Sequence, residues 1–112
     1  MCQPPPHAEA FNSDPFFDAQ PQQHLRDALS ELGVSRLWEL RELDTDTNKE
    51  LDLAALEPLY TGAEGYWTDA TLDWLVYASH EGSVTVAGER LLPALQRRWP
   101  EWTQHGYDPS YD

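Results

Sequence analysis

The sequence is poor in cysteine and has no long apolar run. Its single cysteine, Cys2, cannot form an intramolecular disulfide, which excludes a disulfide-stapled secreted scaffold. No segment approaches the ~20 consecutive apolar residues of a transmembrane helix. The N-terminal stretch "MCQPPPHAEA" has neither the basic start nor the apolar core of a signal peptide. We therefore expect a cytoplasmic protein with no membrane partner.

Basic residues are also scarce. Seven of them oppose twenty acidic residues, which gives a formal net charge of −13 in 112 residues. This charge disfavours nucleic acid and anionic membranes, because phosphate groups would be repelled. It favours a basic protein partner, since long-range attraction raises the association rate. The alternative to a basic partner is that the acidic residues only keep the protein soluble.

The acidic residues are concentrated in the middle of the chain. Between Glu39 and Glu81, eleven acidic residues oppose only Arg41 and Lys49, which leaves a net charge of −9. Three of the seven basic residues follow at positions 90, 97 and 98. This asymmetry favours a functional role for the charge over solubility alone.

Recognisable metal, phosphate and nucleophile motifs are missing. The four histidines are scattered, and no spacing matches a zinc site. Asp44 and Asp46 begin a segment that resembles a calcium loop, but Lys49 stands where the EF-hand needs glycine and Ala55 where it needs glutamate. We expect no metal and no cofactor.

Hydrophobic periodicity predicts a small α+β fold, with a central hairpin in an antiparallel sheet and two helices packed on one face. Apolar residues at i, i+3, i+4 and i+7 predict a helix over 21–33, and a similar stripe predicts a second helix over 89–99. The expected strands are 34–43, a short strand from residue 49 followed by a helical turn near Pro58, residues 66–68, and the hairpin of 74–79 and 83–87.

One domain is expected, over residues 21–102. Residues 1–20 are rich in proline and predict a flexible tail, and residues 103–112 predict a second tail. The first tail contains Phe11, Phe16 and Phe17. These side chains either fold back on the domain or form a docking motif, which would make the protein an adaptor.

The hairpin is expected to turn on a two-residue loop, Glu81-Gly82, because Gly82 supplies the left-handed conformation that a tight loop needs. In that register Tyr77 faces Val86. One face then carries Leu75, Tyr77, Val84 and Val86, and the other carries Trp74, Val76, Ala78, Thr85 and Ala87. The second, apolar face needs a cover, and a homodimer through it is an open alternative.

The hairpin also contains the polar run Ser79-His80-Glu81. Consecutive strand residues point to opposite faces, so Ser79 and His80 diverge and do not form a catalytic triad. A hydrolase or another enzyme that uses His80 with Glu81 or Asp73 is the alternative to a binding protein.

Residues 59–88, "LYTGAEGYWTDATLDWLVYASHEGSVTVAG", resemble a segment of small bacterial proteins with no assigned activity. The resemblance implies a compact α+β domain. The overall profile, a small acidic protein rich in Trp and Tyr, is similar to immunity proteins that neutralise bacterial toxins. This second resemblance implies a basic toxin as the partner.

The leading hypothesis is an acidic binding module that inhibits a basic protein, such as an immunity protein that masks a toxin. Acidic side chains would steer the partner, while aromatic side chains would anchor it. The candidate anchors include Trp38 and Tyr66. The full set of candidate partner-binding residues is Glu39, Glu42, Asp44, Asp46, Trp67, Asp69, Asp73, Trp74, His80 and Glu81.

Overall fold

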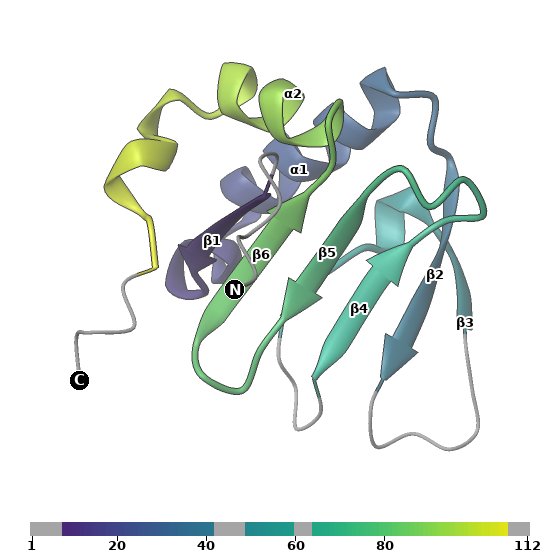
Figure 1. The fold of residues 1–112 in the computed structure, drawn as a ribbon, viewed down its shortest axis with the longest axis horizontal. Helices are drawn as coiled ribbons and strands as arrows, with labels where there is room; N and C mark the ends of the chain where they lie inside the picture. The colour runs from purple at the N-terminus through teal and green to yellow at the C-terminus, as the bar shows by residue number, and fades with distance from the viewer. Residues whose placement is uncertain (1–7, 42–48, 60–63, 108–112) are drawn as a thin grey trace, which may run out of the picture.

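Six antiparallel strands form one sheet in the computed structural model, which describes residues 8–41, 49–59 and 64–107 (Figure 1). Their order across the sheet is β1-β6-β5-β4-β2-β3. The hairpin of β5 and β6 therefore has a neighbouring strand on each side, in agreement with its apolar sequence. The strand bounds are Ala8–Asn12 (β1), Arg36–Arg41 (β2), Lys49–Asp52 (β3), Gly65–Thr68 (β4), Leu75–Ala78 (β5) and Ser83–Ala87 (β6).

Both α-helices pack on the same face of the sheet (Figure 1). Their bounds are Ala19–Glu31 (α1) and Leu91–Arg98 (α2). The predicted apolar stripe of α1 is buried, and so is that of α2. Three 3₁₀ helices, η1 (Asp14–Phe17), η2 (Leu53–Ala55) and η3 (Pro100–Gln104), each contact α1 or α2. The structure thus confirms the predicted small α+β fold with two helices on one face.

The core lies between the helices and the inner face of the sheet. Because strand residues alternate between the two faces, every second residue of the central strands enters this core. The fully or almost fully buried apolar strand residues are Phe11, Leu37, Trp67, Val76, Ala78, Val84 and Val86. The opposite side of the sheet carries no described helix or strand (Figure 1), and we call it the open face.

The predicted hairpin register is wrong by one residue. The amide of Ser79 donates to the carbonyl of Ser83 at 2.9 Å, so the loop contains three residues, His80 to Gly82. Gly82 is its last residue and has a φ of +88°, the left-handed position of a three-residue hairpin loop. Val76 therefore faces Val86, and Tyr77 faces Thr85.

The shift of one residue exchanges the faces of β6 relative to β5. Val84 and Val86 share the inner face with Val76 and Ala78, and helices cover all four. The face predicted to need a cover is therefore partly core. The hairpin instead places Leu75, Tyr77, Thr85 and Ala87 on the open face.

Residues 8–20 are not a tail. Residues Ala8–Asn12 form β1, which pairs with β6, and α1 begins at Ala19. Phe11 and Phe16 are fully buried, whereas Phe17 is exposed. Two of the three phenylalanines on which the adaptor hypothesis depends are therefore core residues. Residues 1–7 lie outside the described residues.

The segment after α2 also folds back onto the domain. The amide of Asn12 donates to the carbonyl of His105 at 2.8 Å, and the amide of Tyr107 donates to the carbonyl of Ala10 at 2.9 Å. Residues 105–107 therefore cover the outer edge of β1, which would otherwise present unpaired backbone groups. Residues 103–107, the first part of the predicted C-terminal tail, therefore belong to the domain. Residues 108–112 lie outside the described residues.

Candidate functional site

The middle of the open face is a row of neighbouring side chains that crosses five strands. Leu40 faces Tyr66, Tyr66 faces Tyr77, Tyr77 faces Thr85, and Thr85 faces Ala10. The two tyrosine rings stack with their centroids 4.6 Å apart. These side chains are partly buried, although no described helix covers them. The row forms an amphipathic surface of apolar rings and hydroxyl groups.

A more apolar patch lies beside this row, toward the loop between β4 and β5. Trp38 of β2 faces Thr68 of β4. Leu75 lies on the same face in β5, the strand on the other side of β4, where it faces Ala87. Trp38 is 40% exposed and Leu75 is 37% exposed. Large apolar side chains exposed together are typical of interaction surfaces.

Leu72, in the loop between β4 and β5, extends the apolar surface at this end of the sheet. Its side chain is 73% exposed, and its φ is +56°. A left-handed conformation is uncommon for a non-glycine residue and costs free energy. The domain therefore holds an apolar side chain in solvent on a strained backbone. We name Trp38, Leu72 and Leu75 the Trp38 patch.

Carboxylates surround the Trp38 patch. Asp69 accepts a hydrogen bond from the amide of Thr71 at 3.0 Å, which shapes the loop between β4 and β5, and Asp73 lies exposed in the same loop. Glu50 and Asp52 of β3 flank the patch on the other side. A hollow of about 240 Å³ lies next to Trp38 and includes Glu50 and Asp69 in its lining.

One basic residue lies among these carboxylates. The Arg36 guanidinium is 2.8 Å from both Glu50 and Asp52. The hydrogen bond and charge of Glu50, and the charge of Asp52, raise the pKa of Arg36. Four carboxylates and one guanidinium therefore leave this end of the open face acidic.

The other end of the face carries a polar cluster centred on Glu64. Its carboxylate accepts a hydrogen bond from the amide of His80 at 3.2 Å and lies 2.5 Å from Nδ1 of the same residue. Burial raises the pKa of Tyr77, and the hydrogen bond and negative charge of Glu64 raise it further. The Glu64 carboxylate therefore interacts with both the Tyr77 phenol and the His80 imidazole.

This cluster differs from the residue pairs that the enzyme hypothesis named. His80 pairs with Glu64, not with Glu81 or Asp73. The His80 side chain is 62% exposed at the tip of the hairpin.

The predicted site residues are not brought together on one surface. Trp67 and Trp74 are core residues, at 0% and 3% exposure, so neither can anchor a partner. Aromatic character alone predicts binding anchors, but Trp67 points inward from β4 and Trp74, directly before β5, is also buried in the core. Glu39 lies on the inner face, where it accepts a hydrogen bond from the Trp67 indole at 3.0 Å.

The remaining predicted residues divide between the two ends of the sheet. Asp69 and Asp73 lie beside the Trp38 patch, whereas His80 and Glu81 form the tip of the hairpin. Glu42, Asp44 and Asp46 lie outside the described residues. Of the predicted aromatic anchors, Trp38 is exposed and Tyr66 is half-buried.

Sequence reasoning missed Leu72, Leu75, Tyr77 and Glu64. The position of Gly82 in the hairpin loop is the sequence feature that could have placed Leu75 and Tyr77 on the open face. Read as the last residue of a three-residue loop, Gly82 sets the register that leaves both side chains on the open face. No sequence pattern identified the left-handed conformation of Leu72 or the position of Glu64.

Comparison of the chain with protein-family models, curated proteins and solved structures found no match. Across the three described ranges, no helix combines the length and apolar character that crossing a bilayer requires. The fold and the site together define a small acidic α+β protein with an amphipathic sheet face that no described helix or strand covers.

Proposed function

We propose that the protein is an acidic binding module that inhibits a basic protein, in the manner of an immunity protein that neutralises a toxin. The contact surface in this proposal is the Trp38 patch with its surrounding carboxylates. The observation that carries the proposal is the exposure of Trp38 and Leu75 on the open face, with Leu72 exposed in the adjoining loop, at one acidic end of the sheet.

The apolar part of this surface supports an anchoring role. Binding energy at protein interfaces is concentrated in a few buried aromatic and apolar contacts, with tryptophan strongly enriched among them. Trp38 is positioned by a strand, so it is presented on a rigid element and loses little entropy when a partner covers it. Leu72 and Leu75 supply apolar surface on the same end of the sheet.

The charged part supports a role in selecting the partner. Asp69, Asp73, Glu50 and Asp52 form a polar rim that attracts a basic surface and repels an acidic one. Such rims raise association rates and suppress wrong partners more than they raise affinity. A second copy of the chain is a poor occupant, since two molecules of charge −13 repel each other.

The first experiment is affinity capture from cells of the source organism, at low and at moderate salt, with the wild type and with two variants in parallel. Trp38→Ala removes the anchor, and Asp69→Lys with Asp73→Lys reverses the rim. The matched control reverses Glu57 and Glu81, which are exposed and lie outside the Trp38 patch and its rim. We expect the wild type and the control to capture the same basic protein and the two variants to lose it.

The captured protein is then purified and its binding is measured by calorimetry and stopped-flow kinetics. Trp38→Ala should raise the Kd at least ~10-fold, chiefly through faster dissociation. The reversed rim should slow association, and the effect should shrink as salt increases. The proposal fails if no basic protein is captured, or if both variants bind as the control does.

A further inference from the structure

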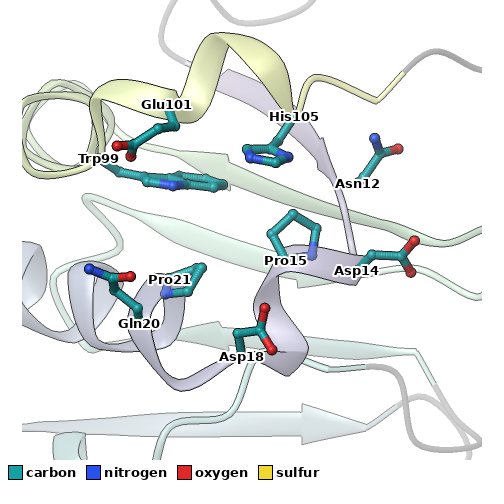
Figure 2. Close-up of a pocket in the computed structure, with 9 residues that line it drawn as sticks. All are labelled: Asn12, Asp14, Pro15, Asp18, Gln20, Pro21, Trp99, Glu101 and His105. Carbon is teal, nitrogen blue, oxygen red and sulfur yellow. The ribbon is translucent and has the colours of Figure 1, made fainter.

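The two edges of the sheet differ in how their backbone groups are covered. At β1, the amide of Asn12 donates to the carbonyl of His105 at 2.8 Å, and Figure 2 shows these two side chains next to each other at this edge. At the opposite edge, β3 pairs with β2 on one side, and no described strand pairs with its other side. The outer edge of β3 therefore presents backbone groups to which a further strand can bind.

The hydrogen-bond register of β3 identifies these groups. The amide of Leu53 donates to the carbonyl of Ser35 at 2.9 Å, so it points toward the strand that Ser35 precedes, β2. Amide directions alternate along a strand, so the amide of Leu51 also points toward β2, and those of Glu50 and Asp52 point outward. The Asp52 carbonyl lies at the start of η2. Both outward amides and the carbonyl of Glu50 are therefore open to a further strand.

The side chains of β3 suit one kind of added strand. Glu50 and Asp52 lie on the open face, opposite Trp38 and Arg36, and the Arg36 guanidinium balances one of the two carboxylate charges. Leu51 lies on the inner face, where it packs against the core. Opposite residues on adjacent strands share a face. An added strand therefore places two alternate side chains beside carboxylates and the side chain between them beside Leu51.

We infer that the basic partner adds an extended segment to β3, with Lys or Arg at alternate positions and an apolar residue between them. This inference rests on the proposed inhibitor function, because the added segment belongs to the same partner and continues the contact surface from the Trp38 patch across the edge of the sheet. Backbone hydrogen bonds would supply affinity, and the alternating side chains would select the segment.

The charges of β3 disfavour other strands. The strand is short and three of its four residues are charged, which discourages pairing with apolar strands. A second copy that paired β3 with β3 would place the carboxylates of Glu50 and Asp52 opposite one another, and like charges directly opposite are destabilising. An acidic segment would meet the same repulsion.

The test is an NMR titration of the ¹⁵N-labelled full chain with the capped peptide Thr-Lys-Val-Lys-Val-Lys-Thr. We expect the amide resonances of Glu50 and Asp52 to shift and their hydrogen exchange to slow. Two N-methylated peptides of the same charge show whether backbone pairing causes these effects. In antiparallel pairing the lysine amides point toward β3 and the valine amides point away. Methylation of the lysine amides should raise the Kd at least ~10-fold, and methylation of the valine amides should leave it unchanged.

A pair of variants at Asp52 tests the same pairing from the side of the domain. The φ of Asp52 is −71° and its ψ is 147°, a conformation that proline adopts without strain. Asp52→Pro removes the outward amide and the carboxylate, whereas Asp52→Ala removes only the carboxylate. Asp52→Pro should bind the peptide more weakly than Asp52→Ala does, and the ¹⁵N spectra show whether both variants fold. The methylated peptides keep the test independent of the proline variant.

The inference is overturned if the amides of Glu50 and Asp52 do not shift at millimolar peptide, if the two methylated peptides bind equally, or if the folded Asp52→Pro and Asp52→Ala variants bind equally. The same shifts on concentrating the free chain would also overturn it, because the occupant would then be a second copy. These outcomes leave the inhibitor function standing, since capture of a basic protein through Trp38 tests that function separately.

Discussion

The rings of Tyr66 and Tyr77 stack across β4 and β5 on the open face, with 4.6 Å between their centroids. The stack shields the Tyr77 phenol and holds it next to Glu64. Burial, together with the hydrogen bond and charge of that carboxylate, raises the pKa of Tyr77 above its ordinary value. Part of the stability of the domain therefore depends on a neutral phenol.

Tyr77→Phe should change the response of the domain to alkali. The folded chain retains the Tyr77 proton at a pH where the unfolded chain, with an ordinary pKa of about 10, loses it. The contribution to stability is therefore complete below about pH 10 and is lost as the pH rises further toward the folded pKa. Urea unfolding from pH 8 to 11 should show a steeper loss for the wild type than for Tyr77→Phe. Equal slopes would contradict the role assigned to burial and Glu64.

Glu31→Gln should change the response to acid. Hydrogen bonds from Arg98 and Arg97 lower the pKa of Glu31, and these contacts join the end of α1 to α2. A lowered folded pKa adds stability that is present above the ordinary pKa of about 4.5 and is lost as the pH falls. The free energy of unfolding of the variant should vary less between pH 5 and 3. Glu89→Gln, at an exposed position, should behave as the wild type does.

Phe11→Ala should destabilise the whole domain and not only its N-terminal segment. The ring is fully buried and packs against Phe16 and Trp99. Removal of a buried phenylalanine costs about 3–5 kcal/mol. Phe17→Ala, at an exposed site, should change the free energy of unfolding by no more than ~0.5 kcal/mol. Urea unfolding followed by tryptophan fluorescence measures both, and a small effect at Phe11 would restore the view of residues 8–20 as a tail.

Gly82→Ala should destabilise the domain by about 1–2 kcal/mol, because its φ of +88° is unfavourable for a residue with a Cβ. Crowding contributes little, since the nearest atom to an added Cβ is Oγ of Ser13 at 3.9 Å. Gly106→Ala is the matched control, because a Cβ added at Gly106 would meet no non-neighbouring atom within 4 Å and the φ of Gly106 is outside the left-handed region. Thermal unfolding of the two variants side by side measures the difference.

Local patterns in the sequence were enough to predict the fold class. The spacing of Leu25, Ala28 and Leu29 defines the buried stripe of α1, and Pro100 follows the end of α2. Such signals are carried by neighbours within a few residues. The strand at residues 8–12 was missed because its partners lie far along the chain, at β6 and at residues 105–107.

The candidate site was only partly predictable, for a related reason. Trp38 and Trp67 are both tryptophans in short strands with acidic neighbours, yet one is exposed and the other is fully buried. Which face of a strand enters the core depends on pairing register and on where the helices pack. A single residue in the hairpin loop decides that register for β6, and composition does not reveal it.

The pairing of residues 105–107 with β1 has a consequence for how the domain forms during synthesis. β1 is held on one side by β6 and on the other by residues that follow α2, so both of its neighbours are made after it. The edge at β1 therefore cannot close until Tyr107 has left the ribosome, and Phe11 waits for Trp99 and Trp102 before its ring is enclosed. Among the described strands, β1 is the one whose pairing partners lie farthest ahead of it in the chain.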